Sequence, residues 1–66
     1  MLRAYLIIFK SQGAVHEWIR FYENITECVE HTRQAIRSEY GDHKIRLVEE
    51  LSGQEFEELT QGQTGD

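Results

Sequence analysis

The fold is decided by the stretch from Arg3 to Tyr22, which reads RAYLIIFKSQGAVHEWIRFY. Two runs rich in β-branched and aromatic residues flank Gln12-Gly13, and Gly13 can adopt the positive φ that a two-residue hairpin loop requires. Such a loop places Arg3 opposite Tyr22 and pairs every residue between them in turn. The stretch therefore predicts an antiparallel hairpin of defined register.

This register divides the side chains between two unlike faces, because residues alternate along a strand. One face pairs Ala4 with Phe21, Leu6 with Ile19 and Ile8 with Glu17. The other has an aromatic ring in every pair: Arg3 with Tyr22, Tyr5 with Arg20, Ile7 with Trp18 and Phe9 with His16. We expect the first face to form the core and the second to be exposed.

A helix should begin at Ile25, because Asn24 and Glu27 have the spacing of a capping box, with Asn in place of the usual Ser or Thr. Gly41 is placed to end it as the left-handed residue after the last turn. Apolar residues recur at steps of three and four between these limits, as on the buried stripe of a helix. This stripe comprises Ile25, Cys28, Val29, Thr32, Ile36 and Tyr40.

A third strand is expected from His43 to Leu51, where apolar and polar residues alternate. The first strand is apolar on both faces, as is typical of a central strand, so we expect the order 2-1-3 with antiparallel neighbours. The fold class is then α+β, with a ββαβ domain over residues 1–51 and one helix on one sheet face. Its expected core is Leu2, Ala4, Leu6, Ile8, Val15, Ile19, Phe21, Ile25, Cys28, Val29, Ile36, Tyr40, Ile45 and Leu47.

Residues 52–66 form an acidic C-terminal segment. Ser52 and Glu55 again have capping-box spacing, which indicates a short helix, and we expect a disordered tail from Gly62 onward. Phe56 and Leu59 lie three residues apart among glutamates. They could contact the aromatic face of the hairpin while the glutamates meet Arg20 or Arg46.

Composition limits the classes of function. The chain has 66 residues, a net charge of −5 and a single cysteine, so it can form one small core and no internal disulfide. We therefore expect oligomerisation to support the fold, and a soluble, cytoplasmic protein without membrane association. The acidic balance disfavours nonspecific binding to nucleic acid, although a local basic patch could override it.

Catalytic interpretations receive little support. Cys28 and His31 are one helical step apart, but Cys28 falls on the predicted core stripe, where a free cysteine behaves as a small hydrophobic residue. His16, His31 and His43 have no recognised metal-ligand spacing. We expect no enzyme activity, no cofactor and no metal.

The predicted interaction face is the aromatic side of the hairpin, joined by two basic residues of the third strand. Concentrated aromatic and arginine side chains are typical of contact sites. Three occupants are open: a second copy of the chain, another protein, or single-stranded nucleic acid stacked on the rings. The face comprises Arg3, Tyr5, Ile7, Phe9, His16, Trp18, Arg20, Tyr22, Lys44 and Arg46.

The order of these segments resembles the small ββαβ proteins of bacteriophages and mobile elements. The resemblance rests on Leu2 to Phe9, Ala14 to Tyr22, a helix ending in Glu39-Tyr40-Gly41, and a final strand through Arg46-Leu47-Val48-Glu49-Glu50-Leu51. It implies a noncatalytic accessory protein that binds, and could inhibit, a host or phage factor. It implies no site residues.

Overall fold

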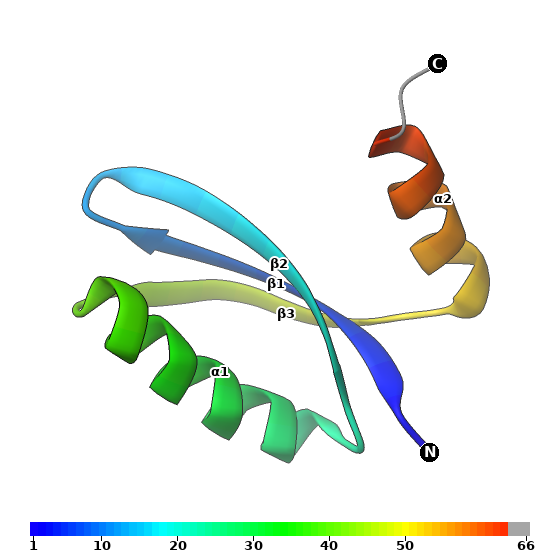
Figure 1. Cartoon of the computed structure of the whole chain (residues 1–66), viewed down its shortest axis with the longest axis horizontal. Helices are drawn as coiled ribbons and strands as arrows, with labels where there is room; N and C mark the ends of the chain where they lie inside the picture. The colour runs from blue at the N-terminus through cyan, green and yellow to red at the C-terminus, as the bar shows by residue number, and fades with distance from the viewer. Residues whose placement is uncertain (64–66) are drawn as a thin grey trace.

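The computed structural model describes residues 1–63, and the side chains of residues 1–59. Its elements follow one another as β1 (Arg3–Ser11), β2 (Ala14–Tyr22), α1 (Ile25–Tyr40), β3 (Lys44–Leu51) and α2 (Gly53–Gln63). The strands form one antiparallel sheet in the order β2-β1-β3. The α+β class and the predicted strand order are confirmed. Figure 1 shows α1 along one side of the sheet and α2 beyond the end of β3, away from α1.

The hairpin has the predicted register along its whole length, from Arg3 opposite Tyr22 to Ser11 opposite Ala14. Its loop is Gln12-Gly13, and both residues have positive φ, 53° and 81°. This is the backbone that a tight hairpin turn of two residues demands, because its twist matches that of the strands.

Helix α1 has the predicted bounds. The Asn24 side chain accepts a hydrogen bond from the Glu27 backbone N–H at 2.9 Å, while the Glu27 carboxylate accepts one from the Glu23 N–H at 3.0 Å. At the other end, the Gly41 N–H donates to the Arg37 carbonyl at 3.0 Å, and Gly41 has φ of 81°. Both ends of α1 are therefore set by local sequence.

A β-bulge changes the expected alternation in β3. Ile45 lies opposite Phe9 and Leu47 lies opposite Ile8, which leaves Arg46 as the extra residue between two neighbouring residues of β1. An extra residue reverses the facing of everything beyond it. Ile45 and Leu47 consequently lie on opposite faces of the sheet, and the prediction that both belong to one core is wrong.

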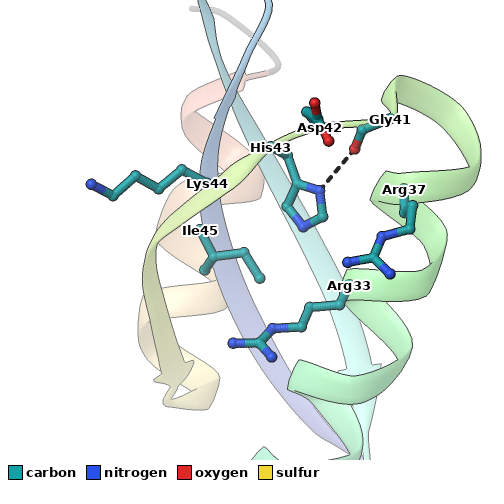
Figure 2. Close-up of a pocket in the computed structure, with 7 residues that line it drawn as sticks. All are labelled: Arg33, Arg37, Gly41, Asp42, His43, Lys44 and Ile45. Atoms are coloured by element: carbon teal, nitrogen blue, oxygen red, sulfur yellow. Dashed lines mark hydrogen bonds between the residues drawn. The ribbon is translucent and has the colours of Figure 1, made fainter.

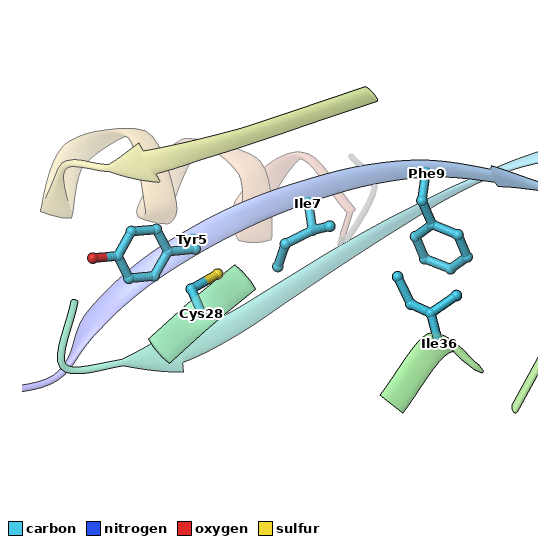
Figure 3. Close-up of a cluster of buried hydrophobic side chains, with 5 residues drawn as sticks. All are labelled: Tyr5, Ile7, Phe9, Cys28 and Ile36. Carbon is cyan, nitrogen blue, oxygen red and sulfur yellow. The ribbon is translucent and has the colours of Figure 1, made fainter. Parts of the chain in front are cut away.

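The helix covers the face of the sheet that we expected to be exposed. Tyr5, Ile7 and Phe9 point from β1 toward Cys28 and Ile36 of α1 (Figure 3), and all five side chains are at most 1% exposed. Trp18, Tyr22, Tyr40, Ile45 and Val48 pack around them as partly buried neighbours. The two faces were separated correctly, but their assignment to core and surface is reversed.

Several residues of the expected core therefore lie at the surface. The large apolar side chains among them are Leu2, Val15, Phe21, Ile25 and Leu47, with exposures of 61%, 62%, 51%, 46% and 41%. Ala4, Leu6, Ile8 and Ile19 are half-buried on the face opposite α1. Cys28 and Ile36 are core residues, as predicted.

The C-terminal segment forms a helix, and the expected capping box is present. The Ser52 hydroxyl accepts from the Glu55 N–H at 3.1 Å, and the Glu55 carboxylate accepts from the Ser52 N–H at 3.1 Å. Helix α2 extends to Gln63, so Gly62 and Gln63 are helical and do not belong to a disordered tail. Residues 64–66 of that expected tail lie outside the described residues. No helix of the described chain is long and apolar enough to cross a membrane.

Candidate interaction surfaces

The rings of the predicted interaction face pack against one another beneath and beside α1. The Phe9 ring lies 5.0 Å from the Trp18 ring, edge to face, and 4.9 Å from the His16 ring, nearly parallel to it. Tyr40 of α1 closes the group, 4.6 Å from His16 and 5.6 Å from Phe9. These rings hold α1 against the sheet, so they do not form an open binding platform.

The basic residues of the same prediction are scattered. Arg20 is exposed and stacks on Trp18, with its guanidinium carbon 4.1 Å from the ring centre. Arg3, near the start of β1, is ion-paired at 3.3 Å with Glu50 of β3, the strand on the opposite side of β1 from β2. Lys44 and Arg46 are exposed on β3, which is separated from β2 by the central strand. The structure therefore brings Arg20 onto a ring of the predicted face, but it does not gather the four basic residues into one patch.

The surface that sequence analysis missed is the sheet face opposite α1, which we call the open face. Its apolar residues are Ala4, Leu6 and Ile8 of β1, Val15, Ile19 and Phe21 of β2, and Leu47 and Leu51 of β3. Lys10, Glu17, Lys44 and Glu49 are the charged residues among them. The alternation that separated the two hairpin faces was the signal that could have found it.

Helix α2 covers one end of the open face. The Phe56 ring meets the Phe21 ring edge to face, with 5.4 Å between their centres. Leu59 borders a shallow hollow shared with Leu6 and Leu51, where it is 38% exposed. The tail therefore makes an aromatic contact, but with Phe21 on the open face and not with the rings of the predicted interaction face. The remainder of the open face, around Ile8 and Leu47, extends beyond α2.

A second candidate surface is a pocket of about 350 Å³ between the end of α1 and the start of β3. Figure 2 shows its lining residues, which are Arg33, Arg37, Gly41, Asp42, His43, Lys44 and Ile45. His43 is held by a hydrogen bond of 3.0 Å between its Nδ1 and the Gly41 carbonyl. The pocket is rich in positive charge, in contrast to the acidic chain as a whole.

The cysteine and histidine of α1 do not form a catalytic pair. Cys28 is fully buried, its Sγ lies 3.9 Å from the Thr32 hydroxyl, and burial raises the pKa of its thiol. His31 is exposed and packs edge-on against Tyr22, 5.6 Å away. A thiol of raised pKa is a poor nucleophile, because the thiolate is the reactive form. Among the described residues, no group of three or more His, Cys, Asp or Glu side chains is arranged to hold a metal ion.

Comparison of the chain with protein-family models, with curated proteins and with solved structures finds no match.

Proposed function

We propose that this protein is a noncatalytic protein-binding module that dimerises through the open face. The observation that carries the proposal is the exposure of large apolar side chains there, with Val15 at 62%, Phe21 at 51% and Leu47 at 41%. Contiguous apolar surface of this kind usually marks a contact site. The molecule is only 16 Å thick along its shortest axis, and among the described residues α2 covers this side of the sheet at one end only.

The charges on the open face favour a second copy as its occupant. Glu17 lies opposite Ile8, while Lys10 lies two residues beyond Ile8 on the same strand. Neither side chain is ion-paired within the described part of the chain. An unpaired acid and an unpaired base that flank one central residue are complementary to the same pair on a second, suitably rotated copy.

Crossed packing of two sheets supplies that rotation. Sheets can pack face to face with their strands near right angles. Such a dimer has a two-fold axis that lies in the plane of the interface, passes over Ile8, and bisects the angle between the strand direction and its perpendicular. Rotation about this axis places Glu17 over Lys10 of the other copy. The same operation places Leu6 over Leu47 of the other copy. Each of these contacts occurs twice in the dimer, because a two-fold axis makes every contact reciprocal.

Dimerisation also offsets the small size of the fold. Chains of this length bury a smaller fraction of their surface than larger domains do, and their stability commonly needs additional support. With one cysteine and an interior of few fully buried side chains, this chain has no internal disulfide to provide that support. A second copy would extend the core across the sheet.

Binding of single-stranded nucleic acid, the alternative expectation, loses its physical basis on the predicted face. Base stacking needs exposed rings. Tyr5 and Phe9 are at most 1% exposed, and Trp18 carries the Arg20 guanidinium on its ring. The role implied by the resemblance to phage accessory proteins, binding and inhibiting a host or phage factor, remains compatible with a dimeric protein-binding module.

A charge-swap series tests the proposed dimer. The variants E17K and K10E each place like charges together across the interface, so each should weaken dimerisation by about tenfold or more in sedimentation equilibrium. The double variant K10E/E17K restores opposite charges and should recover most of the affinity.

The variant E30K makes the same charge change on the exposed surface of α1 and serves as the control. It should dimerise like the wild type. Equal affinities for E17K, K10E and the double variant would refute this arrangement, and a monomeric wild type at every concentration tested would refute the dimer itself.

A further inference from the structure

The pocket beside the end of α1 has two arginines on one side and a fixed histidine at its centre. Arg33 and Arg37 are four residues apart, so they lie on the same face of α1, about 6 Å apart along its axis. Both are exposed, and within the described residues neither forms an ion pair. Figure 2 shows the Arg37 guanidinium to the right of the His43 ring and the Arg33 guanidinium below the ring.

Hydrogen bonds from the tip of the hairpin hold the turn that carries His43. The Ser11 hydroxyl donates to the Asp42 carbonyl at 2.9 Å, and the Gln12 side-chain amide donates to the Tyr40 carbonyl at 3.2 Å. The tip of the hairpin therefore holds the residues that follow α1. Its hydrogen bonds fix one wall of the pocket before any ligand binds, which lowers the entropy cost of binding.

The orientation of the His43 ring follows from its hydrogen bond. A carbonyl oxygen can only accept, so Nδ1 of His43 carries the hydrogen that binds the Gly41 oxygen at 3.0 Å. The ring also packs edge-on against Phe9, 6.5 Å away. Its other nitrogen, Nε2, points into the pocket on the side of Arg33 (Figure 2).

We infer that Arg33 and Arg37 form a binding site for the carboxylates of an acidic segment in a protein partner, and that the His43 ring lines one wall of this site. This inference rests on the proposed function, because it names the surface and the chemistry with which the module meets that partner. A guanidinium binds a carboxylate through two parallel hydrogen bonds. Two guanidiniums one helical turn apart match two carboxylates with the same separation, such as glutamates four residues apart on a helix.

The surroundings favour carboxylates over phosphate groups. The pocket lies at the C-terminal end of α1, where the helix dipole is negative, and Asp42 lines its edge. Both features oppose a dianion more strongly than a single carboxylate. The net charge of −5 also opposes a polyanion such as nucleic acid. An acidic peptide with few charges is repelled least by the helix dipole, by Asp42 and by the net charge of the chain.

The pocket and the open face border each other at Lys44, which belongs to both, but the two arginines of the pocket lie away from the open face. Arg33 and Arg37 belong to α1, which covers one side of the sheet, and the open face is the other side. Each copy in the proposed dimer would therefore retain its own pocket. Loss of dimerisation and loss of the pocket can be observed independently.

The test is a titration of the ¹⁵N-labelled full chain with the peptide Ac-Ala-Glu-Ala-Ala-Ala-Glu-Ala-amide, followed by NMR. We expect saturable shifts of the Arg33 and Arg37 Nε–H signals and of the Gly41 amide. The double variant R33Q/R37Q should weaken binding by about tenfold or more. The variant R20Q removes an exposed arginine from the opposite edge of the sheet and should change affinity by less than about twofold.

Three results would overturn the inference. They are equal shifts with a peptide in which both glutamates are glutamine, undiminished affinity in R33Q/R37Q, or tighter binding of inorganic phosphate or a thymidine oligonucleotide than of the peptide. If the wild type is monomeric but the peptide saturates the pocket, the proposed dimer fails and this inference holds. If the wild type is a stable dimer but the peptide causes no saturable shifts, this inference fails and the proposed dimer holds.

Discussion

The Cys28 thiol is the only cysteine side chain, and the core of the protein encloses it. It is 0% exposed, and burial raises its pKa. We therefore predict that Ellman's reagent modifies the native protein at least about tenfold more slowly than the urea-unfolded chain. Absorbance at 412 nm, about the maximum of the released thiolate, follows the reaction. Equal rates in the two states would contradict the burial of Cys28.

Two weakly acidic side chains in the core, the Cys28 thiol and the Tyr5 phenol, should make the folded state less stable at alkaline pH. Burial raises the pKa of the Cys28 thiol above 9.0, and burial with the nearby Glu50 charge raises the pKa of the Tyr5 phenol above 10.0. The folded state holds these protons more tightly than the unfolded state, so unfolding releases them above the ordinary pKa values. The contribution of these two groups to the free energy of unfolding is fully present below about pH 9, and it is lost as the pH rises through their raised folded-state pKa values.

Urea unfolding between pH 8 and pH 11 checks this expectation. The free energy of unfolding should decline with pH in the wild type, and the decline should be smaller in Y5F, which lacks the ionisable hydroxyl. A free energy that stays constant or rises over this range would contradict it.

At the scale of elements, local sequence determines where α1 begins. Asn24 accepts from the Glu27 N–H, and Glu27 reciprocates at Glu23. The variant N24A should lower the free energy of unfolding by about 0.5–2 kcal/mol, the usual cost of losing such a cap. Chemical denaturation followed by circular dichroism measures the loss.

The matched control is S52A, which removes the corresponding cap of α2. Because α2 contacts the sheet mainly at one end, through Phe56 and Leu59, S52A should change the main unfolding transition much less than N24A does. Equal losses would show that α2 unfolds together with the core.

The elements that depend on neighbouring residues were predictable from the sequence. The hairpin register follows from Gln12-Gly13, and both capping boxes follow from the spacing of their residues. The bulge at Arg46 was not predictable, because nothing in the alternation of β3 indicates an extra residue. That bulge places Ile45 under α1 and Leu47 on the open face.

The choice of the buried face also lay beyond local sequence, because both faces of the hairpin are substantially apolar. The arginines made one face look exposed, yet Arg3 and Arg20 sit where their long side chains reach solvent or stack on a ring. The large rings of Tyr5 and Phe9 instead fill the space beneath α1. Because the buried face was chosen wrongly, the candidate interaction site was also predicted on the wrong side of the sheet.

At the scale of the whole molecule, the protein is two layers over most of its area, with α2 adding partial cover at one end of the open face. The apolar side chains that were expected to build a core are consequently available at the surface. This arrangement explains how a chain with a mean hydropathy of −0.58 can still present a strongly apolar contact face.

The most direct test of the proposed dimer is an isotope-filtered NOE experiment on an equal mixture of ¹³C-labelled and unlabelled full-length protein. In the proposed dimer, we expect NOEs between the methyl groups of Leu6 in one copy and Leu47 in the other. NOEs between copies that arise only from α1, or no such NOEs at concentrations up to about 1 mM, where even millimolar self-association would be detectable, would contradict it.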